Sequence, residues 1–149
     1  MKSLVFPVCC LVALALLGGC ETKQARYETM AEARSDGLFS RGWAPDVLPK
    51  TAGPIEEVHD LDTNARCFRA TFSADSLEVV RSALLRAGFA THSKATAAWP
   101  PPEEFCPFSP SDIEAGRLFH RSTESSQHEY VAVGGDSILY FWSNGDAPQ

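Results

Sequence analysis

The spacing of apolar and polar positions predicts two helices in this chain. Residues 26–38 carry a partial apolar stripe at helical spacing, which predicts a first helix that ends near Gly37. Asp75, with Glu78 three positions later, predicts the start of a second helix as a variant of the capping box. Its apolar positions fall on one face, and Gly88 ends it. Both helices should therefore pack against a core.

Period-two alternation predicts strands on either side of the second helix. The segments with this pattern are residues 55–61, 66–72, 117–122, 129–133 and 137–142. Residues 62–64 predict the turn between the first two, and Gly134 with Gly135 predicts a tight hairpin between the last two. This order predicts an α+β fold, with an antiparallel sheet of about five strands and one or two helices on one face.

The first residues form a separate unit. Lys2 precedes an almost unbroken apolar run over residues 4–17, which is the pattern of a signal peptide. The run is shorter than the roughly 20 residues that a transmembrane helix needs, and it contains Pro7. A cleaved leader is therefore favoured over a permanent membrane span.

A short motif closes this run: Leu17-Gly18-Gly19-Cys20. A branched apolar residue, two small residues and a cysteine resemble the lipobox of bacterial lipoproteins. The resemblance implies cleavage before Cys20, a diacylglyceryl group on its thiol and an acyl chain such as palmitate on its amine. Because Glu21 is not the aspartate of the inner-membrane retention signal, the resemblance also implies an outer-membrane protein that faces the periplasm. An ordinary cysteine after a secretory signal is the alternative.

These features divide the chain into three parts. Residues 1–19 are the expected signal peptide, residues 20–25 a lipidated N-terminus and short tether, and residues 26–149 a single globular domain. The formal net charge of -6 disfavours nucleic acid as a partner.

The sequence carries no specific catalytic or cofactor-binding motif. Asp60, Asp62 and Asn64 copy the first ligand spacing of a calcium loop. However, Ala65 stands where that loop needs glycine and Thr71 where it needs glutamate, so a plain turn is favoured. The four histidines lack ligand spacing and would have to converge by folding to bind a metal. We therefore expect no enzymatic activity, cofactor or metal.

A proline-rich segment, residues 93–111, offers a candidate contact for a partner. It carries Trp99, Phe105 and Phe108, and connections of this length are usually functional or poorly ordered. The alternative is that these rings fold back to cover the sheet. Residues 41–72 contain a Gly-Trp-x-Pro segment and an Asp-rich turn, and they are similar to small uncharacterised lipoproteins of Gram-negative bacteria.

Together these patterns favour a non-enzymatic, membrane-anchored envelope lipoprotein that binds another envelope protein. Small size and acidity support an alternative, a periplasmic inhibitor or immunity-type protein. An envelope hydrolase is less favoured and would require a pocket with convergent polar groups.

Two cysteines remain for the folded domain. Cys9 and Cys10 leave with the leader and Cys20 is consumed by lipid, so only Cys67 and Cys106 keep free thiols. The expected compartment is oxidising, which favours a disulfide between them. Two separately buried free cysteines are the alternative.

Replacing the lipid-accepting thiol tests the anchor. We expect Cys20→Ser to leave the protein unprocessed or soluble, because serine cannot take up diacylglyceryl as a thioether. Membrane fractionation after a carbonate wash and intact mass measure both effects. A Cys20→Ser protein that stays in the membrane at its normal mature mass would contradict lipidation.

Overall fold

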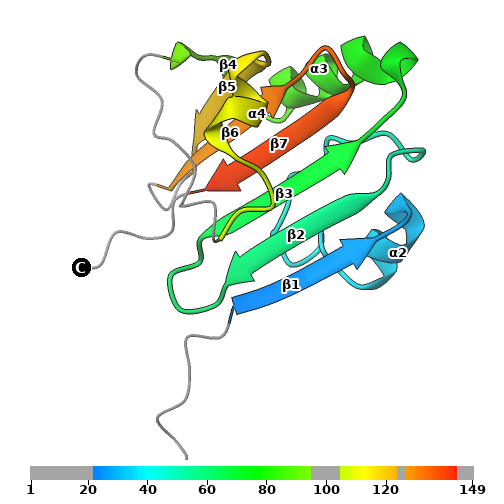
Figure 1. Ribbon diagram of the computed structural model, residues 1–149, viewed down its shortest axis with the longest axis vertical. Helices are drawn as coiled ribbons and strands as arrows, with labels where there is room; N and C mark the ends of the chain where they lie inside the picture. Colours follow the sequence, from blue (N-terminus) through cyan, green and yellow to red (C-terminus); the bar gives the residue numbers. More distant parts are fainter. Residues whose placement is uncertain (1–21, 95–104, 124–126, 144–149) are drawn as a thin grey trace, which may run out of the picture.

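A computed structural model describes residues 22–94, 105–123 and 127–143. Within these ranges the chain forms one antiparallel sheet with the strand order β1-β2-β3-β7-β6-β5-β4 (Figure 1). The strands are β1 (Thr22–Tyr27), β2 (Ile55–Asp60), β3 (Arg66–Thr71), β4 (Ala90–Thr91), β5 (Arg117–Ser122), β6 (His128–Val133) and β7 (Ile138–Ser143). The α-helices are α2 (Met30–Ser35), α3 (Leu77–Arg86) and α4 (Pro110–Glu114). No helix in the described ranges is long and apolar enough to cross a membrane.

Apolar clusters cover both faces of the sheet. Helices α2 and α3 lie on one face, where Met30 and Val80 pack against sheet residues such as Phe68. Helix α4 lies on the other face (Figure 1), where Ile113 packs against Trp142. The α+β class and the antiparallel sheet are confirmed. The expected five strands were too few, and the helices do not all lie on one face.

The N-terminal part of the domain differs from the prediction. Residues 22–27 form β1, which pairs with β2 along its whole length, and the helix begins only at Met30. Thr29 starts this helix because its hydroxyl accepts a hydrogen bond from the Glu32 amide at 3.2 Å. The expected helix over residues 26–38 was wrong at its start, because pairing with a distant strand outweighs a weak local stripe. The expected tether, residues 20–25, overlaps this strand.

The turn between β2 and β3 has a purely local explanation. One oxygen of Asp60 accepts hydrogen bonds from the amides of Asp62 and Thr63, each at 2.9 Å. Asn64 adopts a positive φ of 55°, which asparagine tolerates well. The hydrogen bond from the Thr63 amide has the largest effect on the pKa of Asp60, and it and the bond from Asp62 both lower that pKa. The geometry supports the turn interpretation, and both flanking strands end within one residue of their predicted limits.

The second predicted helix forms, but it begins differently. A 3-10 turn, Ala74–Ser76, precedes α3, so Asp75 lies in that turn and is not the N-cap. The buried stripe is also narrower than expected, because Val80 and Leu84 are fully buried while Leu85 is 57% exposed. The helix therefore contacts the sheet through a thin apolar seam.

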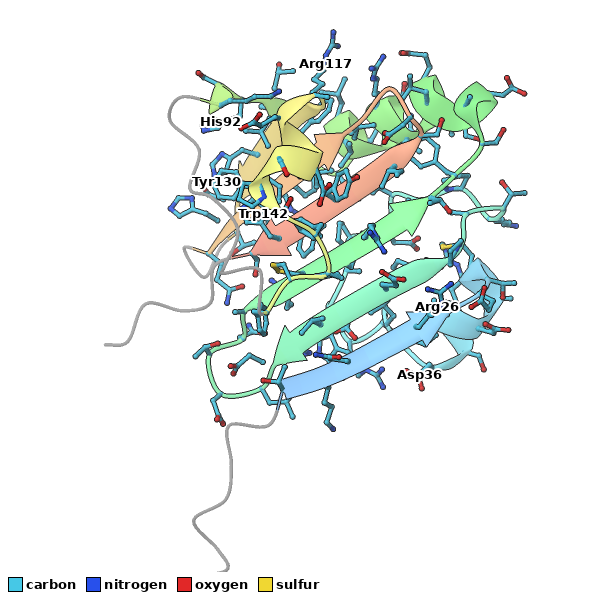
Figure 2. All side chains as sticks on the ribbon, viewed as in Figure 1. Arg26, Asp36, His92, Arg117, Tyr130 and Trp142 are labelled. Atoms are coloured by element: carbon cyan, nitrogen blue, oxygen red, sulfur yellow. A yellow bond between two sulfur atoms is a disulfide. The ribbon has the colours of Figure 1, made fainter. Side chains whose placement is uncertain are left out.

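The face covered by α4 is built around aromatic rings and a disulfide. Cys67 on β3 and Cys106 are bonded, with Cα atoms 5.4 Å apart. Phe108, close behind Cys106, packs edge-on against Tyr140 at 5.2 Å between ring centroids. Tyr130 stacks on Trp142 at 5.4 Å, and Figure 2 shows these two labelled side chains together on this face. The disulfide fixes the segment that leads into α4 onto the sheet.

Removal of this bond should measurably destabilise the domain. The closed loop spans a sequence separation of 39 residues, for which the chain-entropy model gives a loss of roughly 3 to 4 kcal/mol. We expect a Cys67→Ala/Cys106→Ala variant to unfold at correspondingly lower denaturant concentration and to be insensitive to reducing agent. If reduction leaves the midpoint of the wild-type protein unchanged, the bond does not stabilise the fold.

Candidate functional site

A polar hollow lies where β1, β2 and the segment after α2 meet. Its cavity volume is about 350 Å³. The residues that line it are Lys23, Gln24, Ala25, Tyr27, Asp36, Arg41, Trp43 and Glu57. Figure 2 places the labelled Asp36 at this end of the molecule, beside β1 and α2. The site thus combines the outermost strand of the sheet with a loop that follows the first helix.

The alternation of β2 brings an acidic side chain into this site. Ile55, Glu57 and His59 point to the same face as α2, because side chains of a strand alternate. Ile55 is fully buried, and Glu57 and His59 follow it inward with only 2% and 3% exposure. A charged residue in phase with a core position was the sequence signal for this site. The residues predicted from the sequence as a contact site do not include Glu57.

The groups at the rim of the hollow satisfy one another. The Tyr27 hydroxyl donates to Asp36 Oδ2 at 2.7 Å, and Arg41 donates to the same oxygen at 3.0 Å. The Arg41 guanidinium also lies 3.9 Å from the centroid of the Trp43 ring. The hydrogen bond from Tyr27 and the one from Arg41 lower the pKa of Asp36. Burial and the contact with Asp36 raise the pKa of Tyr27.

Glu57, which also lines the hollow, lacks such hydrogen bonds. Neither carboxylate oxygen has a hydrogen-bond partner among the described residues. Burial raises the pKa of Glu57 to about 7, an effect that Arg41 partly opposes and Asp36 reinforces. The nearest titratable group on the same strand is His59, whose Nδ1 lies 3.9 Å from Glu57 Oε1. Burial and then Arg66 lower the pKa of His59. The pair therefore favours its uncharged forms.

A buried ion network holds the wall of the hollow in place. Arg66 donates to Glu129 at 3.1 Å and to the carbonyl of Gly42, which precedes Trp43 in the loop. Glu129 accepts a second charged bond from Arg121 at 2.6 Å. Trp43 in turn packs edge-on against His59, with ring centroids 4.3 Å apart. The loop that lines the site is thereby attached to the central strands.

The residues predicted to contact a partner lie elsewhere. Phe108 is 5% exposed and Phe105 is half-buried against the same aromatic cluster, which favours the alternative that these rings cover the sheet. Trp99 and the lipid-accepting Cys20 lie outside the described residues. The predicted disulfide pair, Cys67 and Cys106, lies beneath α4 and outside the hollow.

Three of the four histidines converge on the face that α4 covers. His120 Nε2 lies 3.0 Å from His128 Nδ1, and the rings of His92 and His120 are 4.8 Å apart between centroids. Burial and these two neighbouring rings lower the pKa of His120. Within the described ranges, no set of three or more histidine, cysteine, aspartate or glutamate side chains is arranged to hold a metal ion.

Comparison with known proteins points to the same part of the molecule. Residues 21–71, about a third of the chain, match the family model of the YbbD head domain. No curated protein and no solved structure matches the chain. The matched segment extends from just before β1 to the end of β3 and contains every residue that lines the hollow. Over these residues the chain is similar to the YbbD head domain.

Proposed function

We propose that this protein is a non-enzymatic envelope lipoprotein, anchored through Cys20, that binds another envelope protein along the outer edge of β1. The observation that carries the proposal is that β1 is an edge strand of the sheet formed by the described residues, with a hollow on each of its two faces. The similarity of residues 21–71 to the YbbD head domain, which indicates a small bacterial envelope-type family, supports the setting.

Strand β1 offers an edge long enough to receive a partner strand. It heads the strand order and pairs with β2 from Thr22 to Tyr27. No further strand pairs with its other side among the described residues, so an extended segment can pair with the backbone N–H and C=O groups there. The opposite edge, β4, has only Ala90 and Thr91. Lys23 and Arg26 on β1 are exposed, and charged side chains on an edge strand disfavour non-specific pairing with other strands.

The hollows provide places for the side chains of an added strand. A second hollow of about 330 Å³ is lined by Arg26, Glu56, Val58 and Pro107, among others. The side chains of Glu56 and Val58 point to the opposite face from that of Glu57, because neighbouring residues alternate. An added strand would likewise direct successive side chains to the two faces, which is how strand addition achieves specificity.

A lipid anchor on Cys20 would hold this edge close to the bilayer. Strand β1 begins at Thr22, two residues after Cys20. With lipid on Cys20, those residues reach roughly 7 Å when extended, so the edge would lie near the membrane surface. A partner in the same membrane or the adjoining periplasm is therefore within reach.

Site-specific photocrosslinking in cells tests this surface. We expect a photoreactive residue at exposed Gln24 on β1 to give a discrete protein adduct. The same residue at Leu85, which is 57% exposed on α3, is the matched control and should give none. The Gln24 adduct should fall sharply in the Cys20→Ser background, because the edge is no longer held at the membrane.

Two outcomes would count against the proposal. One is the absence of an adduct at Gln24, and the other is an equal adduct at Gln24 and Leu85. Replacing Phe105 with alanine distinguishes contact through the β1 edge from contact through the proline-rich segment. If that change abolishes the Gln24 adduct while the fold is intact, the contact depends on Phe105 and the β1 edge is insufficient.

A further inference from the structure

We propose that the hollow under β1 takes a cationic group, an ammonium or guanidinium, with the Glu57 carboxylate as its counter-ion. The placement of this cation on a lysine or arginine of an added strand rests on the proposed function above. The capacity of the hollow to bind a cation does not.

The first argument is the state of Glu57. Its side chain is 1% exposed, both oxygens are buried without hydrogen-bond partners among the described residues, and Glu57 is one of the residues that line the hollow. An ionised carboxylate only accepts hydrogen bonds, and leaving it buried without donors is costly. Ammonium and guanidinium groups only donate, so they complement it directly.

The second argument is that the neighbouring charges are already engaged. Arg41 is bound by Asp36 at 3.0 Å and lies against the Trp43 ring, and Asp36 also accepts from Tyr27. Arg41 makes no hydrogen bond to Glu57 that would satisfy the buried oxygens. The carboxylate of Glu57 is thus the lining group that an incoming donor would satisfy.

The third argument is the shape and character of the lining. A volume of about 350 Å³ lies within the range of ligand pockets and accommodates the end of a lysine or arginine side chain. Tyr27 and Trp43 supply ring surface against which an alkyl stem can pack. Because β1 forms one wall, a side chain that projects from a strand added to β1 enters the hollow directly.

Binding should be linked to proton release. The charged and titratable groups around Glu57 are Lys23 and Tyr27 on β1, Asp36 and Arg41 after α2, His59 on β2 and Arg66 on β3. A bound cation favours the ionised carboxylate and so lowers the pKa of Glu57 from its value of about 7. Affinity for a cation should therefore rise as the pH increases from about 6 to about 8.

The test uses small cations on the mature wild-type chain. The probes are n-butylammonium and ethylguanidinium, followed by NMR through the indole N–H of Trp43. We expect saturable shifts at about pH 8 that weaken at about pH 6. Glu57→Gln should weaken binding about tenfold or more, since it removes the charge and keeps the shape. Glu56→Gln, on the opposite face of the same strand, is the matched control and should bind like the wild type.

Measuring the stability of Glu57→Gln against denaturant distinguishes a loss of binding from a loss of the fold. A raised folded-state pKa means that native Glu57 holds its proton more tightly than the unfolded chain does. The resulting stabilisation is present at low pH and is lost as the pH rises through about 7. Glu57→Gln should therefore unfold at higher denaturant concentration than the wild type at about pH 8, and this advantage should shrink towards about pH 5.

Three results would overturn the cation site. They are equal shifts in Glu57→Gln and wild type, equal binding of uncharged n-butanol, and preferential binding of butyrate. Cation binding without a Gln24 crosslink would retain this site and remove the strand-addition function. A crosslink at Gln24 without cation binding would do the reverse.

Discussion

The buried guanidinium of Arg66 is the constraint on which the rest of this half of the molecule depends. It reaches Ser143 on β7 at 3.3 Å, Glu129 on β6 at 3.1 Å and the backbone of Gly42 in the loop after α2. A buried charge is tolerated only with such complete pairing, and removal of one partner typically costs about 3 to 5 kcal/mol. The network thereby joins three strands and fixes the loop that forms one wall of the hollow.

Two buried glutamates on the same face of the sheet differ in their hydrogen bonding. Glu129 accepts charged hydrogen bonds from Arg66 and Arg121, so its buried charge is paired within the fold. Glu57 is as deeply buried, yet its oxygens have no partner among the described residues. Burial without pairing lowers stability, so Glu57 does not serve the fold as Glu129 does. This contrast is the physical ground for regarding the hollow as a binding site.

The covering of the second face is the reason why the proposed binding surface lies at the β1 end. The disulfide of Cys67 and Cys106 and the ring of Phe108 close the sheet over β3, β6 and β7. On the same face, beyond the disulfide, Glu56 is flanked by Arg26 and Arg69. These ion pairs are partly exposed to solvent, so they contribute little to the stability of the fold. Among the described residues, neither the disulfide nor the ring of Phe108 covers the outermost strands β1 and β2 on this face.

The sequence by itself determined the elements whose signal is local. Alternation located β2, β3, β5, β6 and β7, and the hydrogen bonds of Asp60 explain why its turn could be predicted from residue type. The cysteine count and the expected oxidising compartment identified Cys67 and Cys106 as the available pair. Only the tertiary structure made residues 22–27 a strand, because their partners lie on β2, between 28 positions (Tyr27 and Ile55) and 38 positions (Thr22 and Asp60) further along the chain. It also decided the site, because Tyr27 on β1, Arg41 after α2 and Glu57 on β2 come from three segments whose approach depends on packing and on the pairing of Arg66.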